Sequence, residues 1–305
     1  MKRRGEPNGG GAGMRAVRAV LGAAGILLAA AASRAGVLPV APGRGGPFDL
    51  NLSGSIEGLP AGGWGHLRRA DLLALPATTL AVRDELGPRI QTVRAIFLSD
   101  LLARLPLRRG ADLVLAECSD GYLSVYPLAF IRAYRPFLIV SVGGRGPADW
   151  PALGVPAGAG PYVIDVSTEL VPAAARLRDL GHKQPWGVVA LRVTTVADAF
   201  GALYRGRWAG LGAAAADGRD IWINSCASCH FGPDGATGGS KAGRPFAVVA
   251  AFAAAAPDFL RQYVRDPQSL MPGAKMEPHP YYSRRDLDDL IAFLTAGQNG
   301  GPKAP

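Results

Sequence analysis

The sequence predicts an α+β protein, in which a β-rich mixed N-terminal part precedes an all-α C-terminal part. Short apolar runs bounded by turn-forming residues dominate the N-terminal part, as expected for strands. Apolar residues at helical spacing and a C-x-x-C-H motif occupy the C-terminal part. The 41 glycines and 25 prolines favour many turns over a helical bundle. With 305 residues, of which 49% are hydrophobic, the chain can form two domains, each with its own core.

Residues 1–35 have the composition of a signal peptide or an N-terminal anchor. Basic residues up to Arg18 precede an apolar run from Ala19 to Ala32. This run of about 14 residues suits a signal peptide and is short for a membrane span of roughly 20 residues. We therefore expect a periplasmic chain, either soluble or held by this segment as an anchor. Residues 36–47 are rich in glycine and proline and are expected to form a linker.

The net charge of +9 does not predict nucleic-acid binding. Six basic residues and one acidic residue lie in the first 34 positions, so this leader holds five of the nine charges. Residues 213–305 hold nine basic and nine acidic side chains and are neutral. A basic surface for binding a polyanion is therefore not expected in the mature chain.

Residues 48–196 are expected to form the β-rich mixed domain. Strands are predicted over residues 50–56, 112–118, 123–126, 137–142, 162–166 and 188–196. Short helices are predicted over residues 66–75 and 99–105, the second with Ser99 as its N-cap. Residues 197–212 are rich in small side chains and are expected to connect this domain to the next.

The motif Cys226-Ala227-Ser228-Cys229-His230 is the attachment signature of a c-type haem. Cysteines three positions apart lie about one helical turn from each other, so both thiols can form thioethers with one porphyrin. The histidine that follows can then bind the iron as its proximal ligand. We therefore predict one covalent haem c, held by Cys226 and Cys229, with His230 on the iron.

Two other interpretations of the motif are weaker. A thioredoxin-like redox pair would need a surrounding βαβ pattern, which the sequence lacks. A zinc site would need two further ligands, whereas the only other cysteine is the distant Cys118.

Three helices are predicted around the motif. The first opens at Asp217 and leads to Cys226, and the second covers residues 257–264 with Asp258 as its N-cap. The last begins at Ser283, whose side chain can cap it. It carries an apolar stripe that is expected to pack on the first helix, made of Leu287, Leu290, Ile291 and Leu294.

With its motif and helices, the segment 213–297 resembles a class I monohaem cytochrome c, followed by a tail at 298–305. Met271, Met276 and His279 are the candidates for the sixth iron ligand. The run Pro272-Gly273-Ala274-Lys275-Met276 is similar to the segment that carries the axial methionine in cytochromes c, so we predict Met276. Lys241 and Arg244 are candidate contacts of the haem propionates, although a position in a solvated loop is the default explanation for both.

Five pieces of residues 48–196 resemble the molybdopterin-binding domain of the sulfite oxidase family. They are Leu73-Ala74-Leu75-Pro76, Leu98-Ser99-Asp100-Leu101-Leu102, Cys118-Ser119-Asp120-Gly121-Tyr122, Gly160-Pro161-Tyr162 and Gly181-His182-Lys183-Gln184-Pro185-Trp186. In that family a cysteine thiolate upstream of the second piece holds the molybdenum, but residues 79–92 contain no cysteine. The resemblance therefore implies a repurposed domain without a molybdopterin cofactor.

Four residues of this part have simple structural explanations. Cys118 is expected to be a buried thiol that behaves as a small hydrophobic residue. His182, like His66, is expected to be a structural histidine. Lys183 matches a family position near the cofactor's phosphate, but an exposed loop lysine would explain it as well.

These features predict an electron-transfer protein instead of a catalyst, with periplasmic redox proteins as partners. The N-terminal part would act as a docking or scaffold module. The alternative is a molybdenum-dependent oxidoreductase, similar to a sulfite dehydrogenase, that passes electrons to its own haem. A third hypothesis, in which the N-terminal part binds another small ligand and the haem senses redox state, has no support in the sequence.

Overall fold

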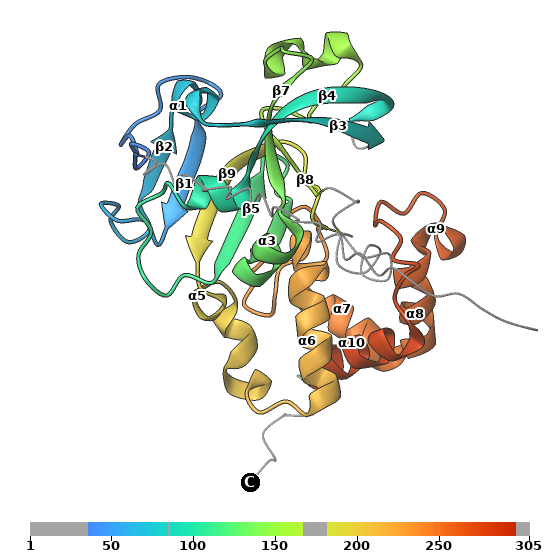
Figure 1. The fold of residues 1–305 in the computed structure, drawn as a ribbon. Helices are drawn as coiled ribbons and strands as arrows, with labels where there is room; N and C mark the ends of the chain where they lie inside the picture. Colours follow the sequence, from blue (N-terminus) through green and yellow to red (C-terminus); the bar gives the residue numbers. More distant parts are fainter. Residues whose placement is uncertain (1–35, 85, 167–181, 297–305) are drawn as a thin grey trace, which may run out of the picture. The chain divides into compact units, whose positions relative to one another are not determined.

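A computed structural model describes residues 36–84, 86–166 and 182–296 (Figure 1). The predicted leader 1–35, the tail 298–305 and Gly181 lie outside the described residues. Strands with short helices fill the described chain up to Thr194, and helices follow from there. The predicted order of a β-rich region followed by a helical region is confirmed.

Five strands form the first sheet, in the order β2-β1-β9-β5-β6. They are β1 (Leu50–Gly54), β2 (Trp64–Leu67), β5 (Leu113–Cys118), β6 (Leu123–Pro127) and β9 (Val188–Thr194). Strands β1 and β9 run parallel, and the other neighbours are antiparallel. Strand β2 was not expected, while the other four confirm the predictions.

Four antiparallel strands form the second sheet, in the order β3-β4-β7-β8. They are β3 (Thr78–Asp84), β4 (Gly87–Phe97), β7 (Phe137–Val142) and β8 (Val163–Asp165). Strands β7 and β8 confirm the predictions. The β3–β4 hairpin has no strong apolar alternation because the first half of β4 is mostly exposed, and the sequence did not reveal it.

Among the described residues, three short α-helices accompany these sheets: α1 (Arg69–Ala74), α2 (Leu98–Leu102) and α3 (Leu128–Tyr134). Helix α1 begins later than predicted because Leu67, paired with Leu50, belongs to β2. The prediction that Ser99 caps α2 is wrong. The helix begins at Leu98, directly after β4, and the carbonyl of Pro136 accepts the Leu98 N–H at 2.8 Å.

Side chains on β5 alternate between two cores. Val114 and Ala116 lie in a core that also holds residues of both sheets and of all three short helices. Leu113 and Leu115 point to the opposite face of the sheet and lie in a second core. That second core continues into the helical part of the chain. Its members there include Trp208, Ile221, Trp222, Phe246, Leu260, Leu290 and Phe293.

The predicted connector forms helix α5 (Val196–Phe200) and two turns of 3-10 helix, Gly201–Tyr204 and Gly206–Trp208. Its Phe200, Leu203 and Trp208 are buried in the second core. The helical part then contains α6 (Ala213–Asn224), α7 (Phe246–Ala255), α8 (Pro257–Arg265), α9 (Pro267–Leu270) and α10 (Arg284–Ala296). Among the described residues, no helix is both long and apolar enough to cross a membrane.

The helix starts differ from the sequence predictions in two places. Helix α6 begins at Ala213 instead of Asp217, since the alanines before Asp217 continue the helix. Asp258 is not the N-cap of α8, which begins at Pro257, and its carboxylate instead pairs with Arg261 at 2.6 Å. Helix α7 was not predicted.

The predicted start of α10 is confirmed. The Ser283 Oγ accepts the Asp286 N–H at 3.2 Å, and the Asp286 carboxylate accepts the Ser283 N–H at 2.9 Å. This reciprocal pair satisfies two donors at the helix N-terminus. The predicted stripe is buried at Leu287, Leu290 and Leu294, and α10 lies alongside α6 (Figure 1).

Candidate haem site

The C-x-x-C-H motif forms a tight turn directly after helix α6. Residues Cys226–Ser228 form one turn of 3-10 helix, and the Cys229 N–H donates to the Cys226 carbonyl at 3.1 Å. The His230 N–H donates to the same carbonyl at 2.9 Å. The two cysteines and the histidine are thus held on one compact turn.

Both cysteines of the motif are free thiols that are half-buried. Burial raises the pKa of Cys226 to about 12 and that of Cys229 to about 11. Both side chains are therefore thiols at neutral pH, and net addition of such an S–H group across a vinyl group would give a thioether.

The side chain of His230 suits a metal ligand. Burial is the largest influence on its pKa and lowers it. The imidazole is therefore neutral at pH 7, as metal binding requires. Its ring lies 5.9 Å from that of Trp222, measured between centroids.

Three buried polar atoms around the motif have no hydrogen-bond partner among the described residues: His230 Nδ1, Trp222 Nε1 and Ser228 Oγ. Buried polar atoms normally have partners, so this cluster is expected where a bound group completes a site. Together with two free thiols and a neutral imidazole, these atoms fit haem c.

A glycine-containing loop packs against the motif. The Gly239 N–H donates to the Ala227 carbonyl at 2.7 Å, and the Ala242 N–H donates to the Cys229 carbonyl at 2.8 Å. Gly238 has a φ of +108°, and a Cβ there would meet the His230 carbonyl oxygen at 2.4 Å. Only glycine suits such a position. The Gly238-Gly239 pair was the available sequence signal, and sequence analysis did not use it.

The two predicted propionate contacts lie beside this loop. The Lys241 Nζ is 2.8 Å from the Asp120 carboxylate and 5.4 Å from the centre of the Tyr122 ring. Arg244 is exposed, and its charge acts on His230. Contact of either side chain with a propionate remains a prediction.

The candidates for the sixth ligand differ in burial. Met271 is 42% exposed, whereas Met276 is half-buried against the core that contains Trp222. His279 is buried, and its Nδ1 lies 2.9 Å from the Tyr281 hydroxyl. Burial lowers the pKa of His279 to about 4, with a further contribution from His230. Burial thus favours Met276 and His279 over Met271, and the choice of Met276 remains a prediction.

Two consecutive residues of the N-terminal part lie beside this site. Lys183 is only 3% exposed, so its explanation as an exposed loop lysine is wrong. Its Nζ donates to the Val125 carbonyl at 2.5 Å and reaches the Asn224 carbonyl at 3.5 Å. His182 is also buried, its Nδ1 bonds the Tyr122 hydroxyl at 2.5 Å, and its Nε2 has no partner among the described residues.

The described residues of the N-terminal part show no cluster of metal-binding side chains. Cys118 is buried, as predicted, and burial raises its pKa to about 12. Metals bind accessible thiolates, whereas Cys118 is a buried, protonated thiol, so it is poorly suited to be a metal ligand. Among the described residues, no group of three His, Cys, Asp or Glu side chains could hold a metal ion.

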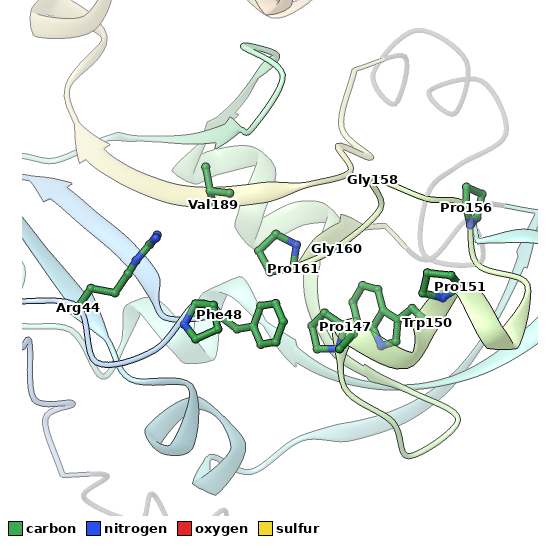
Figure 2. A pocket seen from close by; sticks show the side chains of 12 residues that line it. Arg44, Phe48, Pro147, Trp150, Pro151, Pro156, Gly158, Gly160, Pro161 and Val189 are labelled. Atoms are coloured by element: carbon green, nitrogen blue, oxygen red, sulfur yellow. The ribbon is translucent and has the colours of Figure 1, made fainter.

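A cavity of about 330 Å³ lies in the N-terminal part (Figure 2). Phe48, Pro161 and Trp150 lie along it, and Val189 faces it from β9. Arg44 is the one charged side chain among its described lining residues. Ligand sites usually combine apolar walls with several convergent polar groups, and this cavity lacks the second feature.

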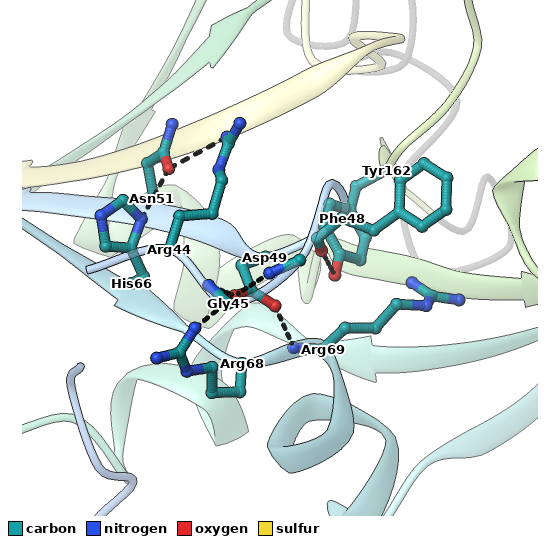
Figure 3. A network of polar contacts seen from close by, with 10 residues as sticks. Arg44, Gly45, Phe48, Asp49, Asn51, His66, Arg68, Arg69 and Tyr162 are labelled. Atoms are coloured by element: carbon teal, nitrogen blue, oxygen red, sulfur yellow. Dashed lines mark hydrogen bonds and ion pairs between the residues drawn. The ribbon is translucent and has the colours of Figure 1, made fainter. Parts of the chain in front are cut away.

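The Asp49 carboxylate organises the loop at one end of this cavity (Figure 3). Its oxygens accept the N–H groups of Gly45, Gly46 and Arg69 at 2.7 to 3.0 Å and pair with the Arg68 guanidinium at 3.0 Å. This network is structural, because every partner of Asp49 is a backbone donor or a neighbouring arginine.

Comparison with known proteins identifies the helical part. Residues 213–294 match the family of cytochrome c oxidase, cbb3-type, subunit III. No curated protein matches the chain. The match begins at the start of α6, includes the motif and the candidate ligand loop, and ends within α10. The C-terminal part is therefore a cytochrome c domain, which implies haem c as its cofactor and electron transfer as its chemistry.

Proposed function

We propose that this chain is an exported electron-transfer protein that passes single electrons through one covalently bound haem c. The observation that carries the proposal is the C-x-x-C-H turn after α6, with two free thiols and a neutral histidine, inside the family match. Haem c supplies a one-electron Fe(III)/Fe(II) couple when bound. Cys226 and Cys229 fix it to the chain, and His230 supplies the first axial ligand.

In this proposal Met276 would be the second residue that holds the haem iron. It is half-buried against the domain core, whereas Met271 is exposed. A thioether ligand favours ferrous iron and raises the reduction potential. With a protein ligand on each side, the iron has no open position for a substrate. That supports electron transfer over catalysis.

The N-terminal part acts as a scaffold for the cytochrome c domain. The support is the shared hydrophobic core, in which Leu113 and Leu115 of β5 join Trp222 of α6. In this proposal, the N-terminal part, which resembles the molybdopterin-binding domain of the sulfite oxidase family, is a repurposed domain. The missing upstream cysteine and the buried Cys118 thiol support a domain that works without molybdenum.

The proposal places the chain in the periplasm, where c-type haem is attached and where the leader 1–35 would direct it. Its partners would be periplasmic redox proteins that dock briefly, through a small interface. The membrane would be involved only if the leader is retained as an anchor.

Metal analysis of the exported protein, combined with its optical spectrum, tests the proposal. We expect about one iron per chain, no molybdenum, and a pigment that stays with the protein during acid–acetone extraction. Molybdenum in an amount equal to the iron would favour the molybdenum-dependent oxidoreductase instead. A colourless protein from a host that matures c-type haem would contradict both functions.

A further inference from the structure

The N-terminal part contacts the haem site through two consecutive residues, His182 and Lys183. The centroid of the His182 ring lies 5.0 Å from that of His279, which belongs to the candidate ligand loop. The Lys183 Nζ reaches the carbonyl of Asn224, the last residue of α6, at 3.5 Å. A cation at a helix C-terminus interacts favourably with the helix dipole. Two neighbouring residues thus contact the end of α6 and the candidate ligand loop.

His182 is fixed from behind by the N-terminal part. Its Nδ1 bonds the Tyr122 hydroxyl at 2.5 Å, and its carbonyl accepts the hydroxyl of Ser124, a fully buried residue of β6. The His182 side chain therefore cannot move without disturbing the sheet. It presents a rigid aromatic face to His279.

The loop that His182 contacts has few other attachments close to Met276. Among the described residues, positions 275–278 form no hydrogen bond with the rest of the chain. The loop is next attached at His279, whose N–H donates to the Val264 carbonyl at 2.9 Å. The His279 ring lies 5.0 Å from that of His182 and is stacked on that of Tyr282 at 5.7 Å. His279 and Tyr282, whose hydroxyl bonds that of Ser225, anchor the loop, and His182 packs against His279.

We infer that His182 is a positioning residue for the haem site, which holds the loop of residues 271–282 by packing against His279. Lys183 holds the end of α6 in the same way. This inference rests on the proposed function, since it concerns the loop that would carry Met276. It assigns the N-terminal part a specific role: it sets the ligand geometry of the haem and hence its spectrum and potential.

The test compares the full-length haem-loaded protein with two histidine variants. His182→Gln keeps a polar group near Tyr122 and removes the ring that faces His279. His66→Gln is the matched control, because His66 lies on β2 and bonds Asn51 at 2.9 Å. Hydrogen–deuterium exchange of peptides from residues 271–282, the near-infrared sulfur-to-iron band and the reduction potential are measured for each.

We expect His182→Gln to keep its covalent haem and its circular dichroism. Amide exchange in residues 271–282 should become several-fold faster, the sulfur-to-iron band should weaken and the potential should fall. His66→Gln should match the wild type in all three measurements. Unchanged exchange and an unchanged spectrum in His182→Gln would overturn the inference.

Two further outcomes also decide the matter. If His182→Gln does not accumulate as haem protein, Tyr122→Phe removes only the hydroxyl that holds His182 and should change the exchange of residues 271–282 in the same direction. No change in Tyr122→Phe would then overturn the inference. If the wild type lacks the sulfur-to-iron band, ligation by Met276 fails, and exchange alone decides the role of His182.

Discussion

Gly218 on α6 lies against the backbone of α10 at Asp289. A Cβ atom on Gly218 would meet the Asp289 carbonyl oxygen at 1.9 Å and the Leu290 nitrogen at 2.8 Å. Both are backbone atoms, so no change of rotamer can relieve the overlap. Because α6 leads directly into Cys226, the position of the haem motif depends on this contact between two helix backbones.

Gly218→Ala should destabilise the protein. In an isolated helix the exchange of glycine for alanine would be favourable by up to about 1 kcal/mol. Here the added methyl group must push α10 away, and overpacking of this kind costs about 1–3 kcal/mol or more. Thermal unfolding of the haem-loaded protein, followed by circular dichroism, should show a lower midpoint.

Gly243→Ala is the control for this substitution. Gly243 lies in the same domain, and nothing lies within 4 Å of a Cβ built on it. Its unfolding midpoint should stay close to that of the wild type. If the two variants unfold at the same temperature, α6 and α10 do not make the close contact described above.

The strands were predictable where both faces of the sheet are buried. In β5 and β7 almost every residue is buried, because side chains on both faces of each strand enter hydrophobic cores, with Phe137, Ile139 and Val142 of β7 in a third core beside the second sheet. Such strands give long apolar runs. Strand β4 was missed because its first half is mostly exposed and its apolar residues begin late. Periodicity therefore revealed the buried strands and not the solvent-exposed hairpin.

The haem motif was predictable, but its surroundings were not. The spacing of Cys226, Cys229 and His230 follows from local chain geometry, which the sequence displays directly. The contacts of His182 and Lys183 with the helical part join residues more than forty positions apart in sequence. No local sequence pattern encodes such contacts. The sequence therefore could not show that Lys183 is buried and not exposed in a loop.

Met276→Ala should abolish the near-infrared sulfur-to-iron band of the oxidised protein while the haem stays attached. The reason is loss of the Met276 thioether, a side chain that is half-buried against the domain core. The reduction potential should fall as well, since the thioether favours ferrous iron. The optical spectrum and a redox titration provide the measurements.

Met271→Ala is the matched control, since Met271 lies on the same loop and is 42% exposed. It should retain the band and the potential. If Met271→Ala loses the band and Met276→Ala keeps it, the ligand assignment is wrong. If the wild type shows no such band and His279→Ala changes its spectrum, the sixth ligand is His279.

Lys241→Gln and Asp120→Asn should shift the reduction potential in opposite directions. Both substitutions break the same ion pair, which is about half-exposed and should contribute less than about 1 kcal/mol to stability. Loss of the positive charge should lower the potential, and loss of the negative charge should raise it, each on the order of tens of mV. Redox titration at low salt measures the shifts. Shifts of the same sign would show that these charges do not act on the iron.

Asp49→Asn should reduce the acid sensitivity of folding. Burial alone would raise the pKa of Asp49, but the hydrogen bonds from Arg69, Gly45, Arg68 and Gly46 lower it from 3.8 to about 2. Because the folded-state pKa lies below the unfolded one, the ionised carboxylate stabilises the fold above about pH 4. That stabilisation, up to about 2 kcal/mol, is lost as the pH falls from about 4 to about 2.

Urea unfolding between pH 6 and pH 2 would measure this loss, with the exposed Asp149→Asn as a control for the change of charge. The wild type and the control should lose free energy of unfolding below about pH 4 more steeply than Asp49→Asn does. At neutral pH, Asp49→Asn should be the least stable of the three, because its amide cannot replace the charged acceptor of four donors. Parallel pH profiles for all three proteins would mean that the network of Figure 3 does not hold an ionised carboxylate.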